Sequence, residues 1–400
     1  MRPASVVLVS VACALLGALA AIGIGSAAGW IGDTDTVIVG GTPQQSGDAA
    51  SAPLQSAAKP LVGRDFDPAR IYEARQSGVV TIFAFFGDET DNTTAASQGS
   101  GFVVSKDGLV LTNSHVVTTA GEGNAPVESA QAVYVQFADG DRVKARIVGY
   151  DPFTDVAVVR VSGNQHKLAP VPLGDSARVV VGEPVAAIGS PFGNESSLTV
   201  GVVSATKRSI ASLTSIYNVV DAIQIDAPIN RGNSGGPLFD ARGRVIGINA
   251  QIRSDSGQNE GVGFAIPINA AKRSLDQLVQ TGTVSYAYVG VTTTNLTPTL
   301  AKRFELPVTQ GAVVNDVRAN SPAARAGIKG ATRDEEFNGI SFPVGGDLIV
   351  AIDDEVVRSA DDVVRLVTEL EPGKVAVFTV FRDGKRQRVA VRLGERPITR

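Results

Sequence analysis

Hydrophobic and polar positions divide the 400-residue chain into zones, and the first zone is continuously apolar. No charged residue occurs between Pro3 and Ile31, and about 20 apolar residues are enough to span a bilayer as a helix. A positive residue precedes this run and Asp33 follows it, an asymmetry that places the N-terminus in the cytoplasm and the rest of the chain outside. We therefore expect a transmembrane anchor within residues 1–31, with a cleaved secretory signal as the open alternative.

The second zone, residues 65–282, predicts a mainly β domain that follows a linker. Residues 32–64 are rich in Gly, Ser, Ala and Pro and are expected to form a flexible linker. From 65 to 282 the chain shows short apolar or alternating runs such as Val79–Phe86 and Val156–Val161, which favour barrels or sandwiches. Two-residue turn signals separate several runs: Asp107-Gly108, Asp139-Gly140 and Arg242-Gly243. One helix is expected near the end, over Asn269–Val279.

The third zone, residues 284–396, mixes strand patterns with helix patterns and predicts a smaller α+β domain. Ser321-Pro322 provides an N-cap and a first helical residue, and Gly327 ends this short helix. A longer helix over 361–370 has one apolar face and is capped by Ser359.

Composition narrows the possible chemistry. The 36 Lys+Arg against 40 Asp+Glu give a net charge of −4, which offers no electrostatic surface for nucleic acid. A single Cys excludes an internal disulfide framework and cysteine-based metal sites, and two His make a His-rich metal site unfavourable. We therefore expect no metal and no cofactor. Acid–base chemistry in this chain must use one or two imidazoles or the carboxylates.

One glycine-rich turn carries a candidate nucleophile. Ser234 lies in Gly232-Asn-Ser-Gly-Gly236 between apolar strands, and glycines allow backbone N–H groups to converge on a reacting oxygen. An ordinary Gly/Ser turn is the alternative for this motif alone. Of the two histidines, His115 follows an apolar strand, whereas His166 lies in a polar loop and is expected to be solvated.

The carboxylate that would orient His115 has two candidates in one segment. Asp155 directly precedes the apolar run Val156–Val161, while Asp151 precedes a proline and is interpreted as a turn residue. The resulting order, His115, Asp155 and then Ser234, is that of chymotrypsin-like proteases and not of subtilisins or α/β-hydrolases. In that fold the site forms in the cleft between two β-barrels.

These motifs resemble the HtrA/DegP family of trypsin-like serine proteases. The resemblance rests on five segments of the second zone: Gly99–Ser105, Leu111–Val117, Thr154–Val158, Asn230–Leu238 and Glu260–Pro267. The third zone resembles the PDZ domain of that family in three segments: Tyr288–Val291, Asn320–Gly327 and Gly346–Ile349. The resemblance covers about residues 70–395, and it implies a chymotrypsin-like double β-barrel at 65–282 followed by a PDZ domain at 284–396.

The resemblance also implies the roles of individual residues. Ser234 would attack the scissile carbonyl, His115 would carry the proton and Asp155 would orient the imidazole. The other expected site residues are grouped by role: Gly232, Asn233 and Ser234 for the oxyanion hole; Ile229 and Ile248 for the specificity pocket; Asn249, Ala250 and Gln251 for the substrate strand; Tyr288, Val289, Gly290 and Val291 for the carboxylate-binding loop of the PDZ domain. No acidic residue lies at the pocket wall, so we expect small aliphatic side chains before the cut.

The implied function is an ATP-independent endopeptidase of the cell envelope that degrades unfolded or damaged proteins. C-terminal peptides would bind the PDZ groove and regulate it, through the loop Thr206–Asp221, and the protein would be a homotrimer. Residues 331–345 are extra relative to the family pattern and are expected to form an exposed insertion beside the groove. One alternative stays open: a PDZ-bearing holdase with latent proteolysis. A metalloenzyme would be inhibited by chelators, and we do not expect that inhibition.

Overall fold

The computed structural model describes residues 66–87, 95–119, 127–162, 166–190, 197–230, 232–252 and 261–397. The expected anchor and linker lie outside these ranges. Within them, no helix combines the length and the hydropathy that a membrane crossing needs.

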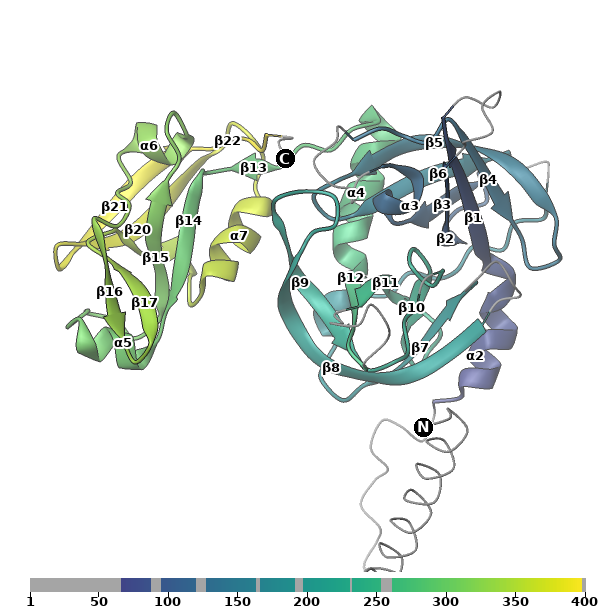
Figure 1. Cartoon of the computed structure of the whole chain (residues 1–400), viewed down its shortest axis with the longest axis horizontal. Coiled ribbons are helices and arrows are strands. Elements are labelled where there is room, and N and C mark those ends of the chain that lie inside the picture. The colour runs from purple at the N-terminus through teal and green to yellow at the C-terminus, as the bar shows by residue number, and fades with distance from the viewer. Residues whose placement is uncertain are drawn as a thin grey trace, which may run out of the picture. The chain divides into compact units, whose positions relative to one another are not determined.

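Six antiparallel strands close into a first β-barrel (Figure 1). In order around the barrel they are β1 (Val79–Phe86), β2 (Ala95–Val103), β3 (Leu109–Thr112), β6 (Val156–Val161), β5 (Arg142–Asp151) and β4 (Ala132–Gln136). β6 is buried at five of its six positions because its two faces pack against different groups. Ala157, Val159 and Val161 fill the barrel interior, whereas Val156 and Val158 belong to a cluster shared with the second barrel.

A second closed barrel follows. Its strands, in order, are β10 (Pro237–Phe239), β11 (Val245–Ile252), β12 (Gly263–Pro267), β9 (Asn218–Ile225), β8 (Ser197–Ala211) and β7 (Pro184–Gly189). The cluster between the barrels joins Phe102 and Leu111 of the first barrel to Ile188 and Phe239 of the second. The predicted mainly β, chymotrypsin-like double barrel is confirmed, and the turn signals lie between paired strands.

Short helices complete this region: α2 (Pro68–Arg75), η1 (Gln76–Gly78), α3 (Ser114–Val117), η2 (Ser176–Arg178) and α4 (Ile268–Thr281). α4 corresponds to the helix predicted over Asn269–Val279. It ends at Gly282, whose φ of 77° is the left-handed conformation that glycine adopts without strain. Its apolar face, with Ala271 and Leu278 fully buried, packs on the cluster between the barrels.

The C-terminal domain is built on one mixed-length antiparallel sheet. The order is β14 (Val291–Leu296), β15 (Gly311–Val317), β18 (Leu348–Ile352), β20 (Val375–Arg382) and β21 (Lys385–Arg392), with β19 (Glu355–Val356) beside β18. β13 (Ala287–Tyr288) pairs with β22 (Gly394–Glu395). The helices are α5 (Pro298–Arg303), α6 (Pro322–Ala326) and α7 (Ala360–Thr368). β14 is therefore an edge strand, and α7 begins with a full capping box between Ser359 and Asp362.

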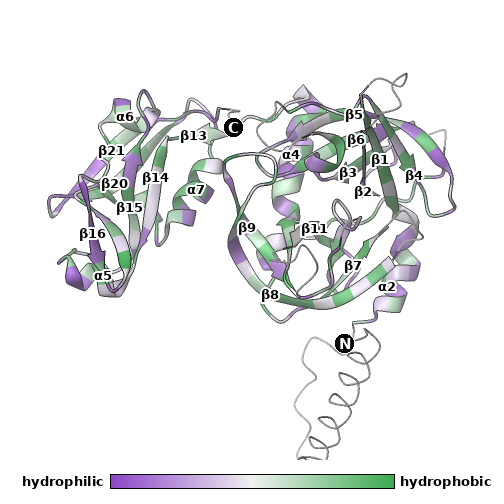
Figure 2. Ribbon diagram, viewed as in Figure 1, coloured by the Kyte–Doolittle hydropathy of each residue, from purple (hydrophilic) through white to green (hydrophobic). Residues whose placement is uncertain are grey.

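The segment 331–345 is largely exposed, as predicted, although Phe342 and Pro343 within it are buried. It forms a hairpin of β16 (Arg333–Phe337) and β17 (Ile340–Val344). Figure 2 shows β16 as mainly hydrophilic, but the hairpin is not simply exposed. Phe342 is 2% exposed and its ring stacks on Phe304, with centroids 5.2 Å apart, next to α5. Sequence reasoning missed this small cluster because Phe304 and Phe342 are far apart in the chain.

Candidate active site

His115 and Asp155 lie side by side at one end of the first barrel. β3 pairs antiparallel with β6, and Thr112 is opposite Ala157. The residues after β3 and the residue before β6 therefore reach the same end of the barrel. The Nδ1 atom of His115 lies 2.7 Å from Oδ2 of Asp155. The structure thus brings together the imidazole and the carboxylate that the sequence favoured.

The Asp155 carboxylate is also held from its other side. Its Oδ1 atom accepts hydrogen bonds from Ser114 Oγ at 2.9 Å and from the His115 N–H at 3.0 Å. Asn113 Nδ2 donates to the Asp155 carbonyl at 2.8 Å. Asp155 is 3% exposed, and its φ of 56° is a left-handed conformation in which Asp is enriched. Sequence reasoning missed Ser114 and Asn113, although both lie in a segment that carried the resemblance.

The carboxylate sets both the tautomer and the pKa of His115. Burial of the ring alone would lower the pKa. The charge of Asp155 and its hydrogen bond outweigh burial, and the net effect raises the pKa of His115 above its ordinary value of 6.5. Because a carboxylate only accepts hydrogen bonds, the neutral imidazole carries its proton on Nδ1 and leaves Nε2 free to accept one.

Ser234 lies in the turn before β10, and its hydroxyl points to a backbone carbonyl. Ser234 Oγ donates to the Ala250 carbonyl of β11 at 2.9 Å. Across the described residues, no hydrogen bond joins Ser234 to His115. Ser234 belongs to the second barrel and His115 to the first, as expected. The Ser234 hydroxyl would have to rotate about the Cα–Cβ bond to reach the imidazole.

Two backbone N–H groups around Ser234 are candidate donors to a reacting oxygen. In the part of the chain described, the N–H groups of Gly232 and Ser234 donate no hydrogen bond, whereas the N–H of the intervening Asn233 donates to Asn230 at 3.0 Å. Gly235 has φ of 85°, and a Cβ there would lie 2.1 Å from the Ser100 carbonyl oxygen. Only glycine fits that position, which explains the Gly-rich turn.

The expected pocket and substrate-strand residues lie close to this turn. Ile229 and Ile248 are 1% and 0% exposed, so neither presents surface to a substrate in this conformation, and their assignment to the specificity pocket stays a prediction. Asn249 and Ala250 belong to β11, which bulges between Asn249 and Gln251. The N–H of Gly235 donates to the Asn249 carbonyl at 2.8 Å, so the strand and the turn are directly bonded.

His166 lies away from this site and pairs with a different carboxylate. Its Nε2 is 2.9 Å from Oδ2 of Asp139. The expectation of a polar surface role needs a correction, because the His166 ring stacks on buried Phe137 with centroids 3.7 Å apart. Phe137 follows β4 and is remote in sequence, so the loop composition gave no sign of it. In the described ranges, no group of three His, Cys, Asp or Glu side chains is spaced to hold a metal.

Asp151, interpreted from sequence as a turn residue, is fully buried. Its Oδ1 atom accepts from the N–H groups of Phe153 and Thr154, at 2.9 and 3.2 Å, and so shapes the turn that leads to Asp155. Its Oδ2 atom accepts from three hydroxyls: Thr154 Oγ1 at 2.5 Å, Ser274 Oγ at 2.7 Å and Tyr286 OH at 2.6 Å. Burial and the Asp151 charge raise the pKa of Tyr286 strongly, so its hydroxyl stays a donor.

Aromatic rings next to this carboxylate surround an arginine. The Arg396 guanidinium lies 5.3, 5.0 and 5.4 Å from the rings of Phe153, Tyr217 and Tyr286. Its backbone N–H donates to the Tyr286 carbonyl at 2.8 Å. Arg396 is 8% exposed, and this burial lowers its pKa.

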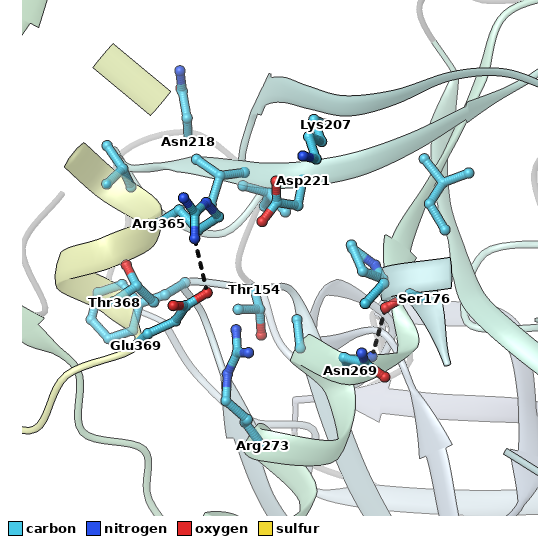
Figure 3. A pocket seen from close by; sticks show the side chains of 18 of the residues that line it. Thr154, Ser176, Lys207, Asn218, Asp221, Asn269, Arg273, Arg365, Thr368 and Glu369 are labelled. Atoms are coloured by element: carbon cyan, nitrogen blue, oxygen red, sulfur yellow. Dashed lines mark hydrogen bonds and ion pairs between the residues drawn. The ribbon is translucent and has the colours of Figure 1, made fainter. Parts of the chain in front are cut away.

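The segment Thr206–Asp221, predicted as a loop, is the end of β8, a turn and the start of β9. It borders a cavity of about 420 Å³ shared with α4 and α7. Figure 3 shows Lys207, Arg365 and Asp221 on this cavity. Burial raises the pKa of Asp221, although the positive charges of Arg365 and Lys207 oppose that shift. Arg365 also lies 3.5 Å from Glu369.

The loop Tyr288–Val291 leads into the edge strand β14. The Val289 carbonyl accepts from Ala323 N–H at 2.9 Å, and the Gly290 carbonyl accepts from Arg318 N–H at 3.0 Å. Among the described residues, the N–H groups of Val289 and Gly290 donate no hydrogen bond. The two carbonyls are therefore bonded within the domain, and a bound carboxylate could accept hydrogen bonds from the two N–H groups.

Two family models match the chain: a trypsin-like peptidase domain over residues 99–248 and a PDZ domain over residues 287–393. A probable periplasmic serine endoprotease, DegP-like, from Brucella suis biovar 1 (strain 1330) is 39% identical over 301 residues, covering 75% of this chain and 53% of the relative. Its counterpart from Halomonas elongata is 40% identical, with 75% and 57% covered. The chain thus spans little more than half the length of these relatives.

Solved structures match over a larger share. The HtrA-type protease AlgW with a tripeptide has a TM-score of 0.67 and 33% identity, covering 83% of this chain and 98% of AlgW. AlgW with a decapeptide gives a TM-score of 0.63 and 32% identity. A serine endoprotease from Yersinia pestis gives 0.58 and 26%.

Proposed function

Because the chain belongs to the family of HtrA-type proteases, we propose that it is a serine endopeptidase acting through His115, Asp155 and Ser234. The observation that carries this proposal is the short His115–Asp155 contact of 2.7 Å, between a partly buried imidazole and a carboxylate that is 3% exposed. No cofactor or metal enters this chemistry.

The proposed cycle starts with a rotation of Ser234 away from the Ala250 carbonyl. His115 Nε2 then takes the hydroxyl proton while Ser234 Oγ attacks the scissile carbonyl, and Asp155 stabilises the imidazolium. The N–H groups of Gly232 and Ser234 would donate to the developing oxyanion. His115 next gives its proton to the leaving amine, and water hydrolyses the acyl-enzyme by the same route.

The substrate would bind as an added strand beside Asn249, Ala250 and Gln251. Ile229 and Ile248 would line the pocket for a small aliphatic side chain before the cut. Sequencing the cleavage products tests this assignment: Val or Ala before the cut supports it, and Lys or Arg there would refute it.

The proposed regulation runs through the PDZ domain. The N–H groups of Val289 and Gly290, which donate to no described residue, would capture a peptide carboxylate, and the open edge of β14 would pair with the peptide beside α7. Asn295 of β14 accepts from the Ala360 N–H at 2.6 Å and so ties α7 to that strand. The electrostatic interaction of Asp221 with Arg365 across the shared cavity would carry the signal to the peptidase domain.

We further propose that the protein is a homotrimer, held by an N-terminal membrane anchor with both domains outside the cytoplasm, and that it removes unfolded proteins there. The DegP-like relatives are named periplasmic, and the uncharged run from Pro3 to Ile31 supports the anchor. Sedimentation velocity tests the trimer. N-terminal sequencing of the native protein distinguishes an anchor from a cleaved signal, because a start at Gly29 means cleavage.

The decisive test compares wild type and Ser234→Ala in degrading an unfolded model protein. Loss of substrate only with wild type supports the proposal, and equal loss with both would refute it. A holdase with latent proteolysis is the second candidate, favoured by the bond between Ser234 Oγ and the Ala250 carbonyl. Prevention of aggregation by both forms, with no cleavage by wild type even with C-terminal hydrophobic peptides, would support it.

A further inference from the structure

Ser100 connects the two barrels at the nucleophile turn, and sequence reasoning gave it no role of its own. It lies on β2 of the first barrel, between two glycines, and is 0% exposed. Its N–H donates to the Ser234 carbonyl at 2.7 Å, and its hydroxyl donates to the Gly232 carbonyl at 2.6 Å. One residue of the first barrel therefore binds both residues whose N–H groups form the proposed oxyanion hole.

The direction of the Ser100 hydroxyl is fixed by its second contact. The N–H of Ser190, at the end of β7, donates to Ser100 Oγ at 2.9 Å. An N–H cannot accept, so the single Ser100 hydroxyl proton is available for the Gly232 carbonyl. Thr112 Oγ1 donates to the Ser100 carbonyl at 2.7 Å and so ties β3 to β2 at this residue.

All three carbonyls of the turn accept hydrogen bonds within the protein, two of them from Ser100. The Gly232 and Ser234 carbonyls bind Ser100, and the Asn233 carbonyl accepts from the Gly236 N–H at 3.0 Å. Peptide planes are rigid, so a carbonyl bonded in this way limits how its neighbours can turn. The Gly232 carbonyl shares its peptide plane with the Asn233 N–H, which donates to the Asn230 carbonyl at 3.0 Å, so rotation of this plane would break both hydrogen bonds and distort the turn that carries the proposed donors.

We propose that Ser100 is a positioning residue for the oxyanion hole: its hydroxyl holds the Gly232 carbonyl in place so that the N–H groups of Gly232 and Ser234 converge. This inference rests on the proposed peptidase function. Losing one oxyanion donor costs about 10²–10³ in kcat. Loosening the turn without deleting a donor should cost less, so Ser100→Ala is expected to lower kcat by about 10- to 100-fold while KM changes less than threefold.

The test uses the full-length protein and two readouts. The first is steady-state cleavage of an unfolded model protein. The second is the rate constant for labelling by a fluorophosphonate, whose phosphoryl oxygen needs the same donors. We expect Ser100→Ala to lower kcat and the labelling rate by similar factors. The matched control is Ser105→Ala, on the turn between β2 and β3, whose Oγ accepts from Leu109 N–H at 3.2 Å and, among the described residues, makes no hydrogen bond to the nucleophile turn.

If Ser100→Ala does not fold, Ser100→Cys keeps a weaker donor of similar shape and should show the same paired loss to a smaller extent. A folded variant with wild-type kcat and labelling rate would overturn the proposal, as would a rise in KM alone. Failure of the peptidase function itself looks different, because wild type and Ser234→Ala would then be equally inactive.

Discussion

The Asp155 carboxylate has two differently occupied oxygens, and this asymmetry predicts the effect of Asp155→Asn. Oδ1 receives the Ser114 hydroxyl and the His115 N–H, while Oδ2 faces His115 Nδ1. An amide nitrogen cannot accept from the His115 N–H, so the asparagine oxygen must take the Oδ1 place. Its NH₂ then faces Nδ1, which has to accept, and the ring proton moves to Nε2.

With its proton on Nε2, His115 cannot receive the Ser234 proton. The geometry survives but the base is in the wrong tautomer, and such a change lowers kcat about 10⁴-fold in a triad of this kind. That factor corresponds to about 5 kcal/mol of transition-state stabilisation. The substrate strand is untouched, so KM should change little.

The pH profile provides a second, independent readout. Activity needs neutral His115, so kcat/KM rises as the pH passes through its pKa. In wild type that pKa is raised, and the acid limb should have its midpoint above 6.5. Asparagine removes both effects that raise the pKa and leaves burial, which lowers it, so the acid limb should move to lower pH.

The assay is hydrolysis of an unfolded model protein between pH 5 and 9. The chain supplies a matched control, because Asp139→Asn removes the carboxylate that pairs with its only other histidine, His166. This control should keep wild-type kcat and the wild-type acid limb. An Asp155→Asn variant within tenfold of wild type, or with an unmoved acid limb, would refute the assigned role.

Three further predictions concern stability and peptide binding. Tyr286→Phe removes a buried bond of 2.6 Å to Asp151 and should cost about 1.5–3 kcal/mol, or a Tm loss of about 3–12 °C by calorimetry; an unchanged Tm would contradict it. Asp347→Ala leaves Arg382, now bonded at 2.6 and 2.7 Å, without its buried partner, and should destabilise the PDZ domain by about 3–5 kcal/mol in urea unfolding; a loss below 1 kcal/mol would contradict it. Gly290→Ala should abolish binding of a C-terminal hydrophobic peptide, measured by fluorescence anisotropy, because the φ of Gly290 is 81° and a Cβ there would lie 2.4 Å from Ser321 Cβ; binding with wild-type affinity would contradict this prediction.

Local patterns were sufficient to predict the two barrels and the neighbourhood of His115. The strand segments are alternating or fully apolar, and the turn signals are two residues long. Each of these predictions therefore depends only on residues that are neighbours in the sequence. His115 and Asp155 could be chosen because each adjoins an apolar strand, and antiparallel pairing then brings those strand ends together.

The residues that sequence reasoning missed depend on contacts between distant segments. Ser100 and Gly232 are separated by 132 positions, and Asp151 and Tyr286 by 135. Asp151 was interpreted as a turn residue because a proline follows it, and it does shape a turn. Its burial comes from Ser274 and Tyr286, and no pattern near Asp151 indicates them. The rotamer of Ser234 likewise depends on β11 and not on its own loop.

The position of Tyr286 matters for anyone who shortens this chain for crystallisation or inhibitor screening. Val284 and Tyr286 follow α4, yet both belong to the cluster between the barrels. A version ending at Gly282 would expose that cluster and leave the Asp151 carboxylate without one of its donors. Ending after Tyr286 keeps the ring and the hydroxyl, but still loses Arg396 from its aromatic surroundings. A shortened enzyme should therefore be compared with full-length protein before its activity is taken as that of the peptidase alone.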